Sequence, residues 1–474
     1  MSLQGLTLYN SRTRRKERFE PIETGHARVY SCGPTVYSAQ HIGNMRPNLF
    51  ADLLKRALLA QGLRVTHVIN VTDVGHLTDD ADAGDDKMEL AARRSGRRAE
   101  EIAAEYTAQW LRDRRRLNCL DPEVLCKASE HIEDQIAMVR QLEAAGVTYR
   151  IEDGIYFDVS KFPRYAELAR LDLEQQLGGK RIGGVAGKRH PADFALWKFA
   201  QPGVQRQQEW DSPWGRGFPG WHIECSAMST KYLGTRFDIH TGGVEHLPVH
   251  HTNEVAQSEV ALGVHPWVNF WMHEDWIVFE GEKMSKSLGN LTVLQDLVDQ
   301  GYLALSLRYF FLQAHYRKQQ SFNPEAMAGA DRGYRRLRAQ AAGLREAEGE
   351  PDPARVEPLR RRFWGAVADD LNAPRALAVA LEVARSEALR PVERRALLQD
   401  FDRWLGLDLL EPLPEPEPEP EDPRIERLVA EREEARRRRD WARADEIRRE
   451  LAAEGILLED TPEGPRWKRS PRSS

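Results

Sequence analysis

Four side chains of the kinds that bind transition metals lie far apart in the sequence: Cys32, Cys225, His250 and Glu254. Two thiolates, one imidazole and one carboxylate form a ligand set that suits zinc. His250 and Glu254 are four residues apart and would share one face of a helix. The spacing of the set is too long for a zinc finger, so the fold itself would have to assemble the site. Each residue, taken singly, is also typical of a protein interior.

A second group, His41 to Asn44 (HIGN), follows a predicted strand and turn and precedes a predicted helix. An imidazole and an amide at a helix N-terminus suit a phosphate group, because backbone N–H groups and the helix dipole favour anions there. Gly43 removes a side chain that would block a nucleotide. Without other motifs, this tetrapeptide is equally typical of a capped helix start.

A third group, Lys283 to Ser287 (KMSKS), is followed by Leu288, Gly289 and Asn290. Two lysines on a glycine-flanked loop can neutralise the charge that develops on a triphosphate, and catalysis of phosphoryl transfer consists mainly of such stabilisation and of positioning. A solvated Lys/Ser loop is the plainer interpretation. The order of the two strings, HIGN and then KMSKS about 240 residues later, is more specific than either string alone.

These two strings resemble the HIGH and KMSKS motifs of class I aminoacyl-tRNA synthetases, with Asn44 in place of the last His. The segments around the metal-binding candidates are similar to those of cysteinyl-tRNA synthetases. The similarity extends over nearly the whole chain, through residues 30–33 (YSCG), 193–198 (DFALWK), 220–226 (GWHIECS), 248–254 (PVHHTNE), 369–374 (DDLNAP) and 438–445 (RRDWARAD).

The resemblance implies a reaction of cysteine with ATP to give cysteinyl-adenylate, followed by transfer of cysteine to the 3′ end of its tRNA. It implies one Zn²⁺ per chain, and Mg²⁺ with the ATP. The residues that it assigns are His41, Asn44, Lys283 and Lys286 as catalytic groups, His41, Gly43, Asn44 and Lys286 as ATP contacts, Trp221, Cys32 and Thr35 as cysteine contacts, and Cys32, Cys225, His250 and Glu254 as zinc ligands.

Zinc suits this selection for a physical reason. Cysteine and serine differ by one atom, and shape alone discriminates such near-isosteres by only ~1–3 kcal/mol, whereas translation needs roughly 10⁴-fold. That factor is about 5.5 kcal/mol. A borderline-soft cation binds a thiolate far better than a neutral hydroxyl and lowers the thiol pKa. On this interpretation no editing domain is needed.

Two departures from the family pattern blur the ligand assignment. After Thr72 and Asp73 the family commonly continues into an Asp-Asp-Lys motif, whereas here His76 and an acidic stretch at 79–86 intervene before Lys87. A further histidine, His246, precedes the His-His-x-Asn-Glu segment. The roles of His76, His246 and the acidic stretch stay open at the level of sequence.

These residues need an α/β scaffold to bring them together. Residues 28–31 and 65–71 are predicted strands, and 48–59 between them is a predicted helix, an order that favours a parallel sheet. Residues 85–145 are expected to form long helices. Strand patterns return at 237–240 and 276–279, and residues 320–410 are expected to be helical. The expected fold class is α/β: a Rossmann-like class I synthetase catalytic domain with a connective insertion, then an α-helical bundle and a small C-terminal module.

The predicted domain boundaries follow from these patterns. They are 1–118 for the first half of the catalytic domain, 119–200 for the insertion, 201–270 for the second half, 271–320 for a stem-contact region with the KMSKS loop, 321–410 for the bundle, 411–423 for a Pro/Glu linker and 424–474 for the C-terminal anticodon-side module. Alternating prolines block helix and sheet in the linker. The arginines of the C-terminal module indicate RNA binding, although nearby Glu and Asp residues are equally compatible with a salt-bridged surface helix.

Composition excludes several classes of protein. The chain has 474 residues with 41% hydrophobic and 30% charged residues, which suits several soluble globular domains. It has no run of ~18 apolar residues for a membrane span and no apolar core of a secretory signal. Four cysteines are too few for a disulfide scaffold. A cytoplasmic location is therefore expected, and the chain is also expected to be a monomer. The net charge of −6 by itself does not indicate a nucleic-acid partner.

Two other functions remain open. A cysteine ligase that joins the adenylate to an amino-sugar would share the catalytic domain and zinc site, but the C-terminal module at 424–469 argues against it. A non-catalytic tRNA-binding paralogue would not need His41, Lys283, Lys286 and four zinc ligands together.

Overall fold

The computed structural model describes residues 5–76, 86–171, 185–201, 203, 206–279, 282–283, 292–412, 423–438, 440–453, 456–461 and 464–469. Among them, no helix is long and apolar enough to cross a lipid bilayer. The chain begins with a short antiparallel hairpin of β1 (Thr7–Asn10) and β2 (Arg15–Arg18).

The centre of the molecule is a five-stranded parallel sheet. Its strand order is β11-β10-β3-β4-β5, and every neighbouring pair is parallel. The strands are β3 (His26–Ser31), β4 (Arg64–Val71), β5 (Val124–Lys127), β10 (Phe237–Gly243) and β11 (Val268–Glu274). The first and fourth strands in chain order are adjacent, which is the Rossmann order, and ligands bind such sheets where this order reverses, beyond the carboxyl ends of the strands.

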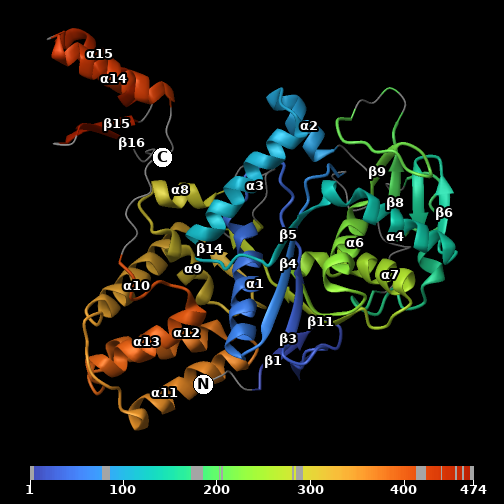
Figure 1. Cartoon of the computed structure of the whole chain (residues 1–474), viewed down its shortest axis with the longest axis horizontal. Coiled ribbons are helices and arrows are strands. Elements are labelled where there is room, and N and C mark those ends of the chain that lie inside the picture. Colours follow the sequence, from blue (N-terminus) through green and yellow to red (C-terminus); the bar gives the residue numbers. More distant parts are fainter. Residues whose placement is uncertain are drawn as a thin grey trace.

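The two faces of this sheet bury different helices (Figure 1). Helix α1 (Ile42–Ala60) shares one hydrophobic core with Val29 and Met272. Helix α6 (Trp221–Leu233) shares the other core with Tyr30 and Trp271, and α7 (His250–Leu262) packs beside α6. The predicted strands at 28–31 and 65–71 and the helix at 48–59 are confirmed within longer elements.

A second sheet, antiparallel and four-stranded, is inserted between β5 and β10. Its strands are β6 (Thr148–Ile151), β7 (Gly154–Phe157), β8 (Phe194–Phe199) and β9 (Gly217–Pro219), and α4 (Ile132–Ala144) precedes them. The predicted insertion at 119–200 does not coincide with the antiparallel sheet, because two strands fall on the other side of its bounds. β5 lies inside that range but is the edge of the parallel sheet, and β9 lies beyond it but belongs to the antiparallel sheet.

The stretch at 85–145, expected to be helical, contains one strand. Helices α2 (Lys87–Ser95), α3 (Ala99–Arg116) and α4 confirm most of it. β5 has only four residues, of which only Cys126 is buried, so that its pattern is too short to distinguish from a helix.

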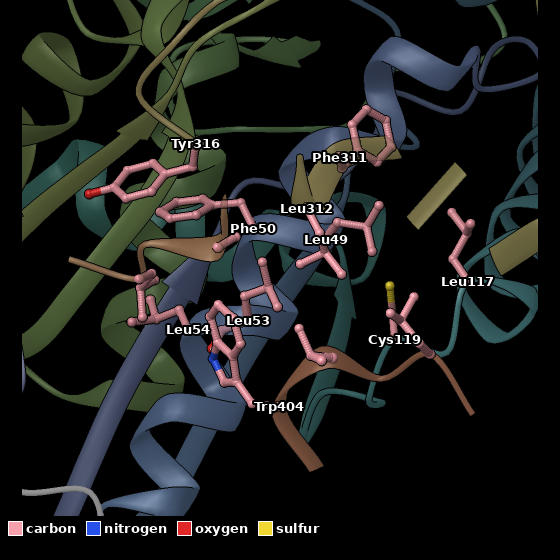
Figure 2. Close-up of a cluster of buried hydrophobic side chains, with 14 of the residues drawn as sticks. Leu49, Phe50, Leu53, Leu54, Leu117, Cys119, Phe311, Leu312, Tyr316 and Trp404 are labelled. Atoms are coloured by element: carbon pink, nitrogen blue, oxygen red, sulfur yellow. The ribbon is translucent and has the colours of Figure 1, made fainter. Parts of the chain in front are cut away.

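The second half of the chain is mainly helical. Its elements are β12 (Ile277–Phe279), β13 (Glu282–Lys283), α8 (Leu294–Asp299), α9 (Ala304–Leu312), β14 (Gln320–Phe322), α10 (Pro324–Ala342), α11 (Pro353–Ala368), α12 (Ala373–Arg385) and α13 (Pro391–Leu405). Figure 2 shows how α1 packs against this part: Leu53 and Leu54 of α1 lie near Trp404 of α13, and Phe50 lies beside Tyr316. The indole of Trp404 donates a hydrogen bond to the Leu53 carbonyl at 3.0 Å.

The C-terminal residues form a small unit with its own core. It consists of α14 (Pro423–Arg437), α15 (Trp441–Ala453) and a hairpin of β15 (Ile456–Thr461) and β16 (Gly464–Arg469). Ile425, Ile447 and Leu451 are among the side chains buried in that core. The predicted linker lies almost entirely outside the described residues.

Candidate metal and nucleotide site

Cys32 lies where the strand order of the parallel sheet reverses. It is the first residue after β3, and its backbone N–H donates to the Thr241 carbonyl of β10 at 3.3 Å. Gly33 follows, and its N–H donates to the Asn70 side chain at 2.9 Å. A Cβ atom on Gly33 would lie 1.6 Å from the Asn70 carbonyl oxygen. Only glycine therefore allows the chain to turn past the end of β4 and present Cys32 at this edge.

The other three predicted ligands come from two neighbouring helices. Cys225 lies on the second turn of α6, and His250 and Glu254 lie one turn apart on α7. One ligand atom from each of Cys32, Cys225, His250 and Glu254 lies within 4.8 Å of every other. The fold thus brings together four residues that are up to 222 positions apart in the sequence, from Cys32 to Glu254.

The chemistry of this group fits a metal ion such as zinc. Glu254 is fully buried, and its Oε1 atom has no hydrogen-bond partner among the described residues, although it lies 3.1 Å from His250 Nε2. Burial opposes ionisation of Glu254, but His240 and His250 lower its pKa to about 2. A hydrogen bond with Cys32 lowers the pKa of Cys225 to about 7, although burial opposes this. A carboxylate and a readily ionised thiol that converge in a buried place are what a divalent cation requires.

Further histidines surround these ligands, and they were not all found from the sequence. His240 Nε2 lies 2.9 Å from Glu254 Oε2, and His251 Nε2 lies 3.4 Å from the Cys32 sulfur. His251 Nδ1 in turn lies 2.7 Å from His273 Nε2. Cys32, His240, His251 and Glu254 form a second group with suitable spacing. The two groups share Cys32 and Glu254, so they offer one ion alternative partners rather than two separate sites.

His240 and His273 had a signal in the sequence that the prediction did not use. His273 lies one residue before the carboxyl end of β11, and His240, in the middle of β10, is in register with Tyr30 near the carboxyl end of β3. Side chains at those ends meet at one edge of the sheet. His222 also joins the cluster, because its Nδ1 lies 2.8 Å from Nδ1 of His250.

Trp221, the predicted cysteine contact, is the first residue of α6 and lies beside the candidate metal ligands. Its ring centroid is 4.6 Å from that of His250 and 6.2 Å from that of His246. His76 is 6.3 Å from the same indole, and its Nε2 lies 2.6 Å from the buried Glu224 carboxylate. His76 and His246 therefore surround Trp221, and neither belongs to the groups with metal-binding spacing.

Thr35, the remaining predicted cysteine contact, lies in the segment that follows Cys32. It forms an isolated parallel bridge with Thr72, just beyond the end of β4. Thr72 N–H donates to the Pro34 carbonyl at 3.0 Å. Thr35 is thus held at the same edge of the sheet as Cys32.

The HIGN residues form the start of α1, as predicted. His41 is the N-cap residue, and Asn44 lies in the first turn, where its side-chain amide donates to Gln40 at 2.8 Å. Ile42 N–H donates to the Thr292 carbonyl at 2.8 Å, and His41 forms a bridge with Val293. Residues 292 and 293, which follow the KMSKS string after four further residues, are therefore hydrogen-bonded to the helix start.

The entry to the KMSKS region is tied to the same helix. Lys283 lies in β13 and pairs with Val278 of β12. Arg46 of α1 is 4% exposed and donates to the Trp276 carbonyl at 2.7 Å and to the Lys318 carbonyl at 2.6 Å. Residues 284–287, including Lys286, lie outside the described residues.

Comparison with known proteins identifies the family. Residues 18–332 match the family model for the class I (C) catalytic domain of tRNA synthetases, and residues 420–467 match that for the anticodon binding domain of cysteinyl-tRNA ligase. The chain is 49% identical to cysteine–tRNA ligase 1 of Burkholderia lata over 463 residues, which is 97% of this chain and 96% of the relative. The chain belongs to the cysteinyl-tRNA synthetase family. A cysteine–tRNA ligase of Thermus thermophilus is 40% identical, with 98% of this chain and 99% of that protein covered.

Solved structures agree with the expected fold. A methionyl-tRNA synthetase of Mycobacterium tuberculosis has a TM-score of 0.55 at 14% identity, covering 81% of this chain and 90% of that chain. A leucyl-tRNA synthetase of Agrobacterium radiobacter has a TM-score of 0.60 at 11% identity, covering 82% of this chain and 84% of that chain. The predicted family, α/β fold and enzyme class, a cysteine–tRNA ligase of class I, are therefore confirmed.

Proposed function

We propose that this member of the cysteinyl-tRNA synthetase family selects cysteine through a zinc ion held by Cys32, Cys225, His250 and Glu254. The observation that carries this proposal is the convergence of those four side chains within 4.8 Å. When bound there, zinc would accept the substrate thiolate as a ligand and bind the neutral hydroxyl of serine far more weakly. The chain then activates cysteine with ATP and transfers it to the 3′ end of its tRNA.

The side chains around the four ligands orient them and shape the pocket. His240 holds one oxygen of Glu254 at 2.9 Å, which leaves Oε1 for the ion. Trp221 packs at 4.6 Å against the ring of His250 and forms a wall of the cysteine pocket. Thr35 completes that pocket from the segment after Cys32.

The start of α1 binds the ATP phosphates. The dipole of this helix attracts anions at its start, although the Ile42 N–H already donates to the Thr292 carbonyl at 2.8 Å and the Asn44 N–H to the His41 carbonyl at 2.9 Å. His41, Gly43 and Asn44 are placed there, and Lys283 and Lys286 neutralise charge that develops as the cysteine carboxylate attacks the α-phosphate. Mg²⁺ accompanies the ATP. Arg46 positions the strand that leads into the KMSKS string, through its contact with the Trp276 carbonyl at 2.7 Å.

The C-terminal unit contacts the anticodon arm of the tRNA. Trp441 at the start of α15 is 58% exposed, the most of the large hydrophobic side chains in the described residues, and can stack on an unpaired base. Arg437 and Arg438 are more than 70% exposed nearby and can reach phosphates, although both also lie within 3.0 Å of Glu434. The family model for an anticodon binding domain supports this proposal over the amino-sugar ligase.

One pair of assays tests the function. Cysteine-dependent ATP–pyrophosphate exchange measures activation, and charging of tRNA measures transfer. A chain ending at Glu421 should keep exchange, because the residues of the candidate site all precede it. Its catalytic efficiency in charging should fall at least tenfold, about 1.4 kcal/mol. Undiminished charging would remove the C-terminal unit from tRNA recognition, and absence of exchange by the full chain would refute the proposed activity.

A further inference from the structure

The last strand of the parallel sheet ends in a carboxyl group that neither the core nor the candidate metal site explains. Glu274, the final residue of β11, is 3% exposed. Among the described residues, its Oε2 atom is buried without a hydrogen-bond partner. A buried polar atom left unpaired costs ~1–3 kcal/mol. A ligand that pairs with this oxygen would remove that cost.

Alternation along β11 places Glu274 on the face of the sheet that α1 covers. His273 points to the other face, where it lies 2.7 Å from His251 in the metal-binding cluster. Phe270 and Met272 belong to the same core as α1. Successive side chains of a strand point to opposite faces, so Glu274 shares the face of Met272. It therefore lies on the side of the HIGN helix, although it is close enough to Cys32 to contribute to the raised pKa of that thiol.

The surroundings of Glu274 belong to the nucleotide half of the site. Arg46, about 6 Å along α1 from Ile42 by the rise of an α-helix, is close enough to act electrostatically on Glu274. In the neighbouring strand, Gly243 is in register with Glu274. The Glu245 carboxylate folds back over Gly243, since a Cβ there would lie 2.4 Å from one of its oxygens. Two acidic side chains thus lie together at the carboxyl edge of β10 and β11.

The chemistry of this place fits a neutral hydroxyl group. Burial, together with the Glu245 carboxylate, raises the pKa of Glu274 to about 8. Near neutral pH the group is then mostly a carboxylic acid, with one O–H donor and one acceptor oxygen. A phosphate would be repelled by Glu245, whereas a sugar hydroxyl both donates and accepts a hydrogen bond and carries no charge. In Rossmann-like folds an acidic residue often serves the ribose of a nucleotide.

We propose that Glu274 binds a ribose hydroxyl of ATP and thereby favours a ribonucleotide over a deoxyribonucleotide. This inference rests on the proposed function, which supplies ATP as the nucleotide. A buried group built to pair with a hydroxyl discriminates strongly against an analogue without it, because the group is then left unpaired.

The test is equilibrium binding of ATP, 2′-deoxy-ATP and 3′-deoxy-ATP to the full-length protein. The wild type should bind one of the two deoxy analogues at least about tenfold more weakly than ATP, about 1.4 kcal/mol. Glu274→Met keeps the size of the side chain but removes both hydrogen-bonding functions, and should bind ATP and that analogue equally. Glu274→Gln keeps a donor and an acceptor and should retain most of the preference. Glu393→Met, at an equally buried carboxyl group of the helical bundle, should leave the preference unchanged.

Three outcomes would overturn the inference. Equal binding of all three nucleotides by the wild type would do so without any variant, even if Glu274→Met failed to fold. A Glu274→Met protein that loses the same factor for every nucleotide would assign Glu274 a purely structural role. A Glu274→Met protein with an unchanged preference would exclude Glu274 from ribose binding. Pyrophosphate exchange by the wild type, measured alongside, separates these results from failure of the proposed function.

Discussion

The ion pair between Arg308 and Asp52 joins α1 to the helical second half of the chain. Both side chains are 0% exposed, and Arg308 Nη2 lies 2.6 Å from Asp52 Oδ2. Arg308 also donates to the carbonyls of Leu405 at 2.6 Å and Leu117 at 2.9 Å. We expect Arg308→Met to lower the free energy of unfolding by about 3–5 kcal/mol, because removing one partner of a buried pair leaves the other charge uncompensated.

The size of this loss in unfolding free energy depends on the contacts that Asp52 and the two carbonyl groups would keep in Arg308→Met. Asp52 would keep its contact with Arg56 at 2.8 Å, which favours the lower half of that range. The two carbonyl groups would lose their donor, at ~1 kcal/mol each. Burial alone would raise the pKa of Asp52, but Arg308 and Arg56 lower it below its ordinary value. The contribution of the pair is therefore present in full above pH ~4, the unfolded pKa, and is lost only as pH falls through the lower folded pKa.

Arg335→Met is a matched control. Arg335 lies 2.6 Å from Asp331, the same distance as in the buried pair, but its side chain is 46% exposed. Exposed pairs contribute only ~0–1 kcal/mol. Urea unfolding followed by circular dichroism at pH 7 measures both variants. Equal losses in the two, or a loss below about 1 kcal/mol in Arg308→Met, would refute the reasoning from burial.

Three further variants test individual roles in the site. Cys225→Ser should strip the metal or sharply weaken cysteine binding while ATP binding survives, as metal analysis and titration would show; retention of both would exclude Cys225 as a ligand. Lys286→Ala should lower the adenylation rate by more than it raises KM for ATP, because the lysine acts mainly in the transition state; a normal rate with weak ATP binding would argue against this. Trp221→Ala should weaken cysteine binding, whereas loss of stability with intact cysteine affinity would make Trp221 a core residue.

The parts of the fold that the sequence predicted are those with a strong local pattern. Residues 65–71 are rich in β-branched side chains and form the buried strand β4. β11 was missed because Phe270 to Glu274 mixes apolar and polar residues on two buried faces, so that no simple alternation is visible. β5 was too short to distinguish from a helix. Local periodicity cannot record which strands are adjacent, and only that order places Cys32 beside β10.

The candidate site likewise has residues that the sequence identified and residues that it did not. Cys32, Cys225, His250 and Glu254 were identified because each stands in a recognisable string, and the fold brings them together. Glu274 carries no such string, and its interest arises from burial without a partner, which is a tertiary property. The motif strings thus predicted which four side chains the fold brings together, while the contacts around them depend on packing that the sequence does not record.

Zinc selection of cysteine is tested most directly by X-ray absorption at the zinc edge on the purified full-length protein. We expect one zinc per chain, bound by two sulfur atoms and two nitrogen or oxygen atoms. On addition of cysteine the number of sulfur ligands should rise to three, and on addition of serine it should stay at two. An active protein without zinc, or a zinc ion whose sulfur ligands do not increase with cysteine, would contradict the proposed selection.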